Sequence, residues 1–144
     1  IKKERENDRS TIYSSNLARA AFDFGVALQA CDRARNLNYS RIRFYTESGM
    51  PLPPEERNIR GFDQIAKYKE EALFGKAEAE ATLLIEVKNR EYAFPALKSS
   101  EEFIAAFPES VEGYRLRARV YRHWGREAEA LADEQKAREL SAQK

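Results

Sequence analysis

Cysteine and histidine are almost absent from this sequence of 144 residues, which contains one of each, Cys31 and His123. A single cysteine excludes a disulfide within the chain, and one cysteine with one histidine cannot build a zinc cage from these residue types. Charge of one sign is not in excess either, because 25 lysine and arginine residues balance 24 acidic residues. This balance excludes a globally basic nucleic-acid-binding protein.

Long apolar runs are absent as well. No stretch reaches the roughly 18 apolar residues that a membrane-spanning helix needs. The charged segment Lys2–Ser10 has no apolar core behind it, so it does not have the pattern of a signal peptide. We therefore expect no membrane-spanning segment in this chain, and we interpret Lys2–Ser10 as the solvated start of a helix.

Motifs that carry catalysis are also missing. No glycine-rich phosphate loop, nucleophile elbow, HExxH pair or CxxC pair occurs. His123 is expected to cap a helix end, and Cys31 lies on an apolar helix face, where an inert buried thiol is typical. We predict a protein with no enzymatic activity, no metal and no cofactor. The alternative is an enzyme or small-ligand binder without a recognisable motif.

Helical periodicity dominates what is present. From Thr11 to Leu37, apolar residues recur at steps of three and four, which predicts one apolar stripe along an α-helix. Gly25 leaves two alternatives for this stretch, a kinked helix or two separate helices. The segment Tyr39–Glu47 alternates like a strand, but no second strand-like run exists to pair with it. We therefore expect a short helix or an irregular segment there.

The rest of the chain also has helical spacing. Three of the 5 prolines, Pro51, Pro53 and Pro54, predict a loop over Ser48–Glu55. The next apolar stripe keeps its phase across Gly75, which favours one long helix over two. The further elements expected are a helix over Ile59–Val87, a turn at Asn89–Tyr92, a helix over Ala93–Ala106, a boundary at Pro108, and an antiparallel pair, Val111–Trp124 and Arg126–Leu140, around Gly125.

These elements predict a single all-α domain over residues 1–144. Its parts would be an N-terminal helical or capping region (1–48), a Pro-rich loop (49–57) and a set of helical hairpins (58–144).

An internal repeat of 34 residues supports the hairpins. When 77–110 is aligned with 111–144, each of five compared pairs is apolar. The pairs are Leu84 with Ala118, Val87 with Tyr121, Ala96 with Ala130, Leu97 with Leu131, and Phe103 with Ala137. A period of this length is typical of stacked helix–turn–helix units.

Over about 77–140 the chain resembles the tetratricopeptide repeat family. The residues that carry the resemblance are Ala118, Tyr121, Gly125, Ala130 and Ala137 in the last unit, with Leu84, Val87, Ala96 and Pro108 in the preceding one. Three residues depart from the family pattern, namely Arg117 at a leucine position, Glu134 at an aromatic position and Leu84 at a small-residue position. The resemblance implies antiparallel hairpins stacked in one orientation, preceded by a long N-terminal helix; a plain helical bundle is the alternative.

A cationic stripe is the most prominent candidate site. Arg115, Arg119 and Arg122 are spaced at i, i+4 and i+7 on one helix, although like charges at this spacing repel. The resemblance implies that this face lines a concave groove, to which the preceding unit would contribute Ala81 and Ile85 as an apolar patch, together with Glu78 and Lys88. The alternative is that Glu112, Glu127 and Glu129 neutralise the arginines locally.

These features predict a non-catalytic protein–protein interaction module, one part of a larger assembly. An acidic segment or a C-terminal carboxylate would suit the arginines. The alternatives are a structural or oligomerising domain, and a nucleic-acid-associated protein, which overall neutrality disfavours. The segment Phe103–Ser110 is similar to repeats of bacterial envelope proteins, which indicates a cell-envelope (periplasmic) setting.

Overall fold

The computed structural model describes residues 2–51 and 60–143, and over these residues it contains helices and no strand. The elements are α1 (Lys2–Ser48), α2 (Arg60–Ile85), the short 3-10 helix η2 (Arg90–Tyr92), α3 (Ala93–Ala106), α4 (Val111–His123) and α5 (Glu127–Ala142). The predicted all-α fold is therefore confirmed. None of the helices in these two ranges is long and apolar enough to cross a membrane.

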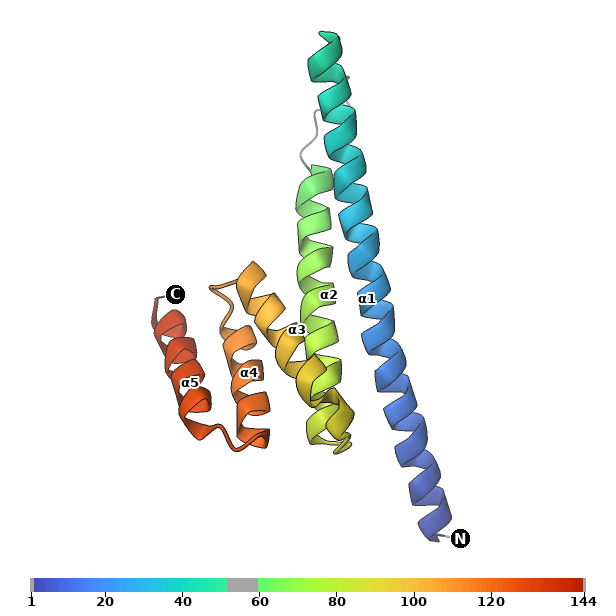
Figure 1. Cartoon of the computed structure of the whole chain (residues 1–144), viewed down its shortest axis with the longest axis vertical. Coiled ribbons are helices and arrows are strands. Elements are labelled where there is room, and N and C mark those ends of the chain that lie inside the picture. The colour runs from blue at the N-terminus through green and yellow to red at the C-terminus, as the bar shows by residue number, and fades with distance from the viewer. Residues whose placement is uncertain (1, 52–59, 144) are drawn as a thin grey trace.

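Helices α1 and α2 form an antiparallel hairpin, and α1 extends past both ends of α2 (Figure 1). Two polar contacts fix their alignment. The Tyr13 hydroxyl donates to Glu86 over 3.4 Å, and Lys69 pairs with Asp32 over 3.1 Å. Because the lower-numbered end of α1 lies beside the higher-numbered end of α2, the alignment is that of a hairpin with one connection.

Gly75 allows the two helices of this hairpin to approach closely. A Cβ atom at Gly75 would lie 2.5 Å from Cζ of Phe24, so the aromatic ring occupies the space of the missing side chain. As expected, α2 runs through Gly75 without a break. Helix α1 likewise continues through Gly25, so it is neither split there nor ended at Leu37. The segment Tyr39–Glu47 is its last part rather than a separate element.

The turns follow the sequence closely. Asn89 accepts a hydrogen bond from the Glu91 amide over 3.1 Å and caps η2, and Ser110 accepts one from the Gly113 amide over 3.3 Å and caps α4. Gly125 adopts φ +70° between α4 and α5, a conformation that favours glycine. After α1, Gly49 has φ +68°, and Pro53 and Pro54 of the predicted loop lie outside the described residues.

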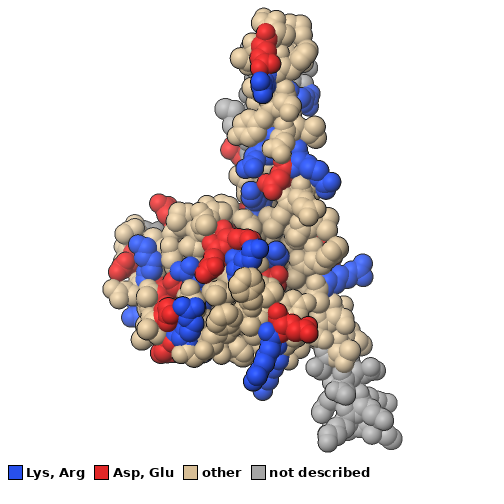
Figure 2. All heavy atoms as spheres, viewed as in Figure 1, with Lys and Arg blue, Asp and Glu red and all other residues tan. Residues whose placement is uncertain are grey.

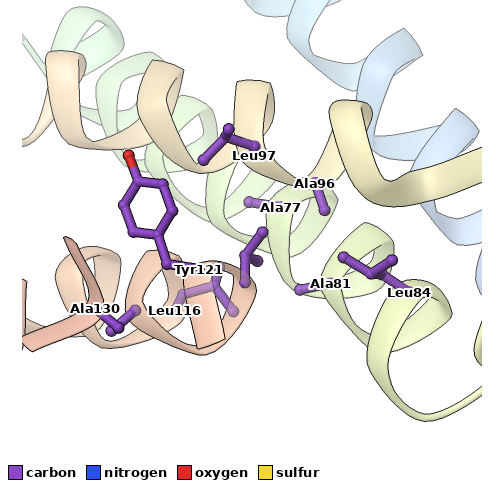
Figure 3. Close-up of a cluster of buried hydrophobic side chains, with 10 residues drawn as sticks. Ala77, Ala81, Leu84, Ala96, Leu97, Leu116, Tyr121 and Ala130 are labelled. Atoms are coloured by element: carbon purple, nitrogen blue, oxygen red, sulfur yellow. The ribbon is translucent and has the colours of Figure 1, made fainter. Parts of the chain in front are cut away.

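Helices α2 to α5 pack in a simple order. Helix α4 contacts α2, α3 and α5, whereas among the described elements α5 contacts α4 alone. Small residues bring the helices together, since Ala77, Ala96, Ala118 and Ala130 are all buried in one core cluster. Tyr121 extends from α4 toward α3 and fills the space beside them (Figure 3).

Candidate partner-binding groove

Helix α4 presents Arg115 and Arg119 on an exposed face, one turn apart. The start of α4 is held against α3 by Gly113, where a Cβ atom would lie 2.8 Å from Cδ1 of Phe103. The two arginines line a surface groove of about 350 Å³ between α4 and α5. Its lining residues are Arg115, Arg119, Glu134, Ala137 and Arg138. The structure thus brings two of the predicted arginines together and adds a third guanidinium from α5.

The charges in this groove are only partly compensated. Arg115 pairs with Glu112 over 3.0 Å, and Arg138 lies 3.8 Å from Glu134. Arg119 makes no ion pair with any of the described residues. Three guanidinium groups and one carboxylate line the groove, so it is cationic although the protein has a net charge of only +1.

Arg122, the third arginine of the predicted stripe, serves a different purpose. It pairs with Glu134 over 2.5 Å and with Glu127 over 3.3 Å, and it is not among the residues that line the groove. These hydrogen bonds, the one that Arg122 donates to Glu134 above all, raise the pKa of the Arg122 guanidinium. Arg122 therefore holds Glu134 from one side while Arg138 approaches it from the other.

The alternative interpretation, local neutralisation by three glutamates, applies to two arginines of the stripe and to Arg126, which lies just after the turn. Glu112 pairs with Arg115 and Glu127 with Arg122, as described above. Glu129 pairs with Arg126 over 2.6 Å, and this hydrogen bond lowers the pKa of the Glu129 carboxyl. Arg119 is the exception. Among the described residues, the stripe thus keeps one guanidinium, that of Arg119, without an ion pair.

The residues predicted on α2 do not line this groove. Ala81 is 1 % exposed and belongs to the core, and Ile85 is half-buried and packs against the same core. The expected apolar patch beside the arginines is therefore wrong, because α4 itself contacts α2 and the core cluster takes up Ala81. Lys88 is exposed in the turn after α2, at φ +60°.

The residues contributed by α5 were not predicted as site residues. Glu134 and Arg138 are spaced at i and i+4, which places them on one helix face. The available signal was the departure from the family pattern, since a glutamate at an aromatic position of the second helix must find a charged partner or solvent. Its partners are Arg122 and Arg138.

A second departure from the pattern of the resembled family joins α4 to α5 through two residues that do not line the groove. Arg117 donates two hydrogen bonds to the buried Asp133, over 2.8 and 2.7 Å, and so joins α4 to α5. These hydrogen bonds raise the pKa of the Arg117 guanidinium, although burial opposes them. The same guanidinium lies 5.8 Å from the ring centre of Tyr114 and 5.6 Å from that of Tyr121. The pair fixes how far apart the two walls of the groove lie.

The remaining candidates do not form a site. His123 is exposed and Cys31 is half-buried. Within the part of the chain that the structure describes, no group of three histidine, cysteine, aspartate or glutamate side chains could hold a metal ion. Figure 2 shows acidic and basic side chains interspersed over the visible face, without a large area of one sign.

Comparison of the chain with protein-family models, with curated proteins and with solved structures gave no match.

Proposed function

We propose that this protein is a non-catalytic helical-repeat module, similar to tetratricopeptide repeats, that binds a carboxylate of a partner protein in the groove between α4 and α5. The observation that carries the proposal is Arg119, an exposed guanidinium that forms no ion pair with a described residue and shares a groove with Arg115 and Arg138. A planar guanidinium presents two parallel donors to a carboxylate, so an unpaired one is suited to this ligand.

The packing order supports a repeat-like arrangement. In stacked hairpins the leading helix of the second unit touches both helices of the first, and α4 contacts α2 and α3 in this way. Because α5 contacts α4 alone among the described elements, the α4–α5 face is open to a ligand or to a further unit. A peptide whose acidic side chain or terminal carboxylate reaches Arg119 would use that face.

The volume and charge of the groove favour a peptide over nucleic acid. A groove of about 350 Å³ holds a few side chains, not the backbone of a duplex. On the face that Figure 2 draws, acidic and basic side chains are interspersed, so this face offers no extended basic surface to follow a phosphate chain. Glu134 adds selectivity, because a ligand must place its carboxylate near Arg119 and keep negative charge away from Glu134.

The test is a peptide array in which each sequence is made with a free and with an amidated C-terminus, and half of the sequences carry acidic residues. We expect binding to depend on a carboxylate. Arg119→Glu should weaken it by about tenfold or more, as for the loss of a charge-assisted hydrogen bond, and leave the melting temperature nearly unchanged.

The matched control is Lys98→Glu, the same change of charge at an exposed position on α3, whose side chain lies 3.9 Å from Glu102. This variant should bind like the unmodified protein. Equal binding by Arg119→Glu and the unmodified protein, or no preference for carboxylate-bearing peptides, would reject the groove as the binding site. A steep loss of affinity with added salt for single-stranded DNA would instead favour the nucleic-acid alternative.

A further inference from the structure

Helix α1 carries a second row of apolar side chains, here called the outer row. Its members, which are 45 to 70 % exposed, are Ile12, Phe22, Val26, Leu37 and Phe44. At 3.6 residues per turn these positions lie within about a quarter turn of one another. They are about half a turn from Ala21, which is buried, and Phe24, which packs at Gly75 of α2. The outer row therefore points away from the hairpin partner.

The outer row keeps to one face over the length of the helix. Phe22 and Arg33 are separated by 11 residues, as are Arg33 and Phe44, and Val26 and Leu37. A spacing of 11 residues in three turns is close to the natural period of a straight α-helix, so the row does not drift around it. From Ile12 to Phe44 it spans about 48 Å at 1.5 Å per residue.

Nothing in the described part of the chain covers this face. Among the described elements α1 contacts α2 alone, and α3, α4 and α5 lie on the other side of α2 (Figure 1). Exposed apolar side chains that are scattered singly are ordinary, but five aligned along one helix face mark an interaction surface.

We propose that the outer row is the interface with a second copy of this chain, with the two α1 helices antiparallel. A two-fold contact requires that residue i meets j while j meets i. The register that places Ile12 opposite Phe44 of the second copy also places Val26 opposite Ala30 and Asp23 opposite Arg33. Each of these pairs occurs twice, once on either side of the two-fold axis near residue 28.

Charge is the reason to choose a second copy over a lipid surface. Three charged side chains, Arg19, Asp23 and Arg33, lie in or beside the outer row and are exposed. A lipid surface would have to desolvate all three, whereas the antiparallel register places Asp23 of each copy opposite Arg33 of the other. Arg19 lies opposite Leu37 in this register and keeps Asp23 of its own chain as its neighbour. Arg33 makes no ion pair with the described residues of its own chain, and Asp23 has only an exposed pair with Arg19, over 4.0 Å.

The first test is the mass of the full 144-residue chain in solution, by analytical ultracentrifugation over a range of concentrations. We expect a monomer–dimer equilibrium. Phe22→Glu should raise the dissociation constant by about tenfold or more, because a charge replaces a buried aromatic contact. Phe94→Glu on α3, where the phenylalanine is equally exposed (69 % against 70 %), should leave it unchanged.

The second test addresses the register. Asp23→Arg and Arg33→Asp should each weaken self-association, because each places like charges opposite one another twice. An equimolar mixture of the two variants should recover dimers, since every reversed residue then meets a reversed partner. A chain that stays monomeric at all concentrations, a dimer insensitive to Phe22→Glu, or a mixture no better than its components would overturn the proposal. Binding of the monomer to anionic vesicles, abolished by Phe22→Glu, would assign the row to a lipid surface instead.

Discussion

Helices α2 to α5 bury most of their apolar residues against one another, whereas α1 buries one apolar face and leaves another exposed. In the first region, alanines and leucines from four helices meet in one cluster, and the exposed large apolar side chains are few. In the second, eight of the exposed large apolar residues belong to α1. The difference shows that the helical hairpins cover their own apolar faces, while one face of the long helix is left uncovered by every described part of the chain.

The largest expected effect comes from making the same substitution, leucine to alanine, once in each of the two regions. Leu84→Ala removes a side chain that is 1 % exposed and should lower the free energy of unfolding by about 2–5 kcal/mol. Leu37→Ala, at an exposed position of the outer row, should change the monomer's stability by less than about 0.5 kcal/mol. Urea unfolding at low protein concentration measures both. Similar losses for the two variants would remove the contrast between the regions.

The next effect concerns the charged pair within the hairpins. Asp133→Ala leaves the Arg117 guanidinium without its carboxylate and should lower the free energy of unfolding by about 2–4 kcal/mol. We expect a value toward the low end of this range because the Arg117 side chain is 21 % exposed. Adding Arg117→Leu, which removes the uncompensated charge and leaves an apolar side chain, should recover most of the loss. Thermal unfolding followed by circular dichroism is the measurement. A double variant no more stable than Asp133→Ala would show that the pair is not a unit.

Two glycines of the α1–α2 hairpin, Gly25 and Gly75, should respond to the same substitution in opposite directions. Gly25→Ala should stabilise the protein by about 1 kcal/mol, because nothing lies within 4 Å of the added Cβ and alanine favours helix. Gly75→Ala should destabilise it by about 1 kcal/mol, since overpacking against Phe24 exceeds the same gain. Phe24→Leu in the Gly75→Ala background should relieve the loss. Chemical unfolding measures whether each variant has a higher or lower free energy of unfolding than the unmodified protein. If both glycine-to-alanine variants were more stable, the close approach at Gly75 would be contradicted.

The smallest effect tests a buried carboxyl of the core region. Burial raises the pKa of Glu80 above the ordinary range of a glutamate, against the opposing hydrogen bond from Ser99 and the charge of Lys76. The folded state therefore binds a proton at a pH where the unfolded state has released it. Stability should rise as the pH falls through the interval between the raised and the ordinary pKa.

Glu80→Gln should remove this part of the pH dependence and keep the hydrogen bond with Ser99. Glu78→Gln, the same substitution at an exposed position two residues away, is the matched control. The measurement is the free energy of unfolding at a series of pH values. An unaltered slope in Glu80→Gln would show that the carboxyl titrates alike in both states.

Much of the fold was predictable because its signals are local. The helix Ala93–Ala106 has the predicted bounds, and the helices on either side of Gly125 end within two residues of expectation. The secondary structure of Tyr39–Glu47 did not follow from its own residues, since its alternating apolar residues fit a strand as well as a helix. It is helical because it continues α1, and hydrogen bonds along a helix extend cooperatively into a segment of mixed preference.

The candidate site was predictable only in part. The spacing of Arg115 and Arg119 was sufficient to place them on one face, because the helical period is fixed. Which residues lie opposite them depends on how α4 sits between its neighbours, and the sequence favoured α2 where the structure has α5. Ala81 was therefore assigned to a surface although it lies in the core, since a small apolar residue on a helix fits both places.

The cap and the turn of α4 followed from residues close together in the chain, Ser110 before the helix and Gly125 after it, because these features depend on backbone preference and local hydrogen bonds. Which faces meet depended on contacts between distant residues: Phe24 with Gly75, Arg117 with Asp133, and the core around Tyr121. Several helix faces have apolar residues at helical spacing, and packing against other helices decides which of these faces is buried. For that reason the two apolar faces of α1 could be told apart only once α2 was seen to cover one of them.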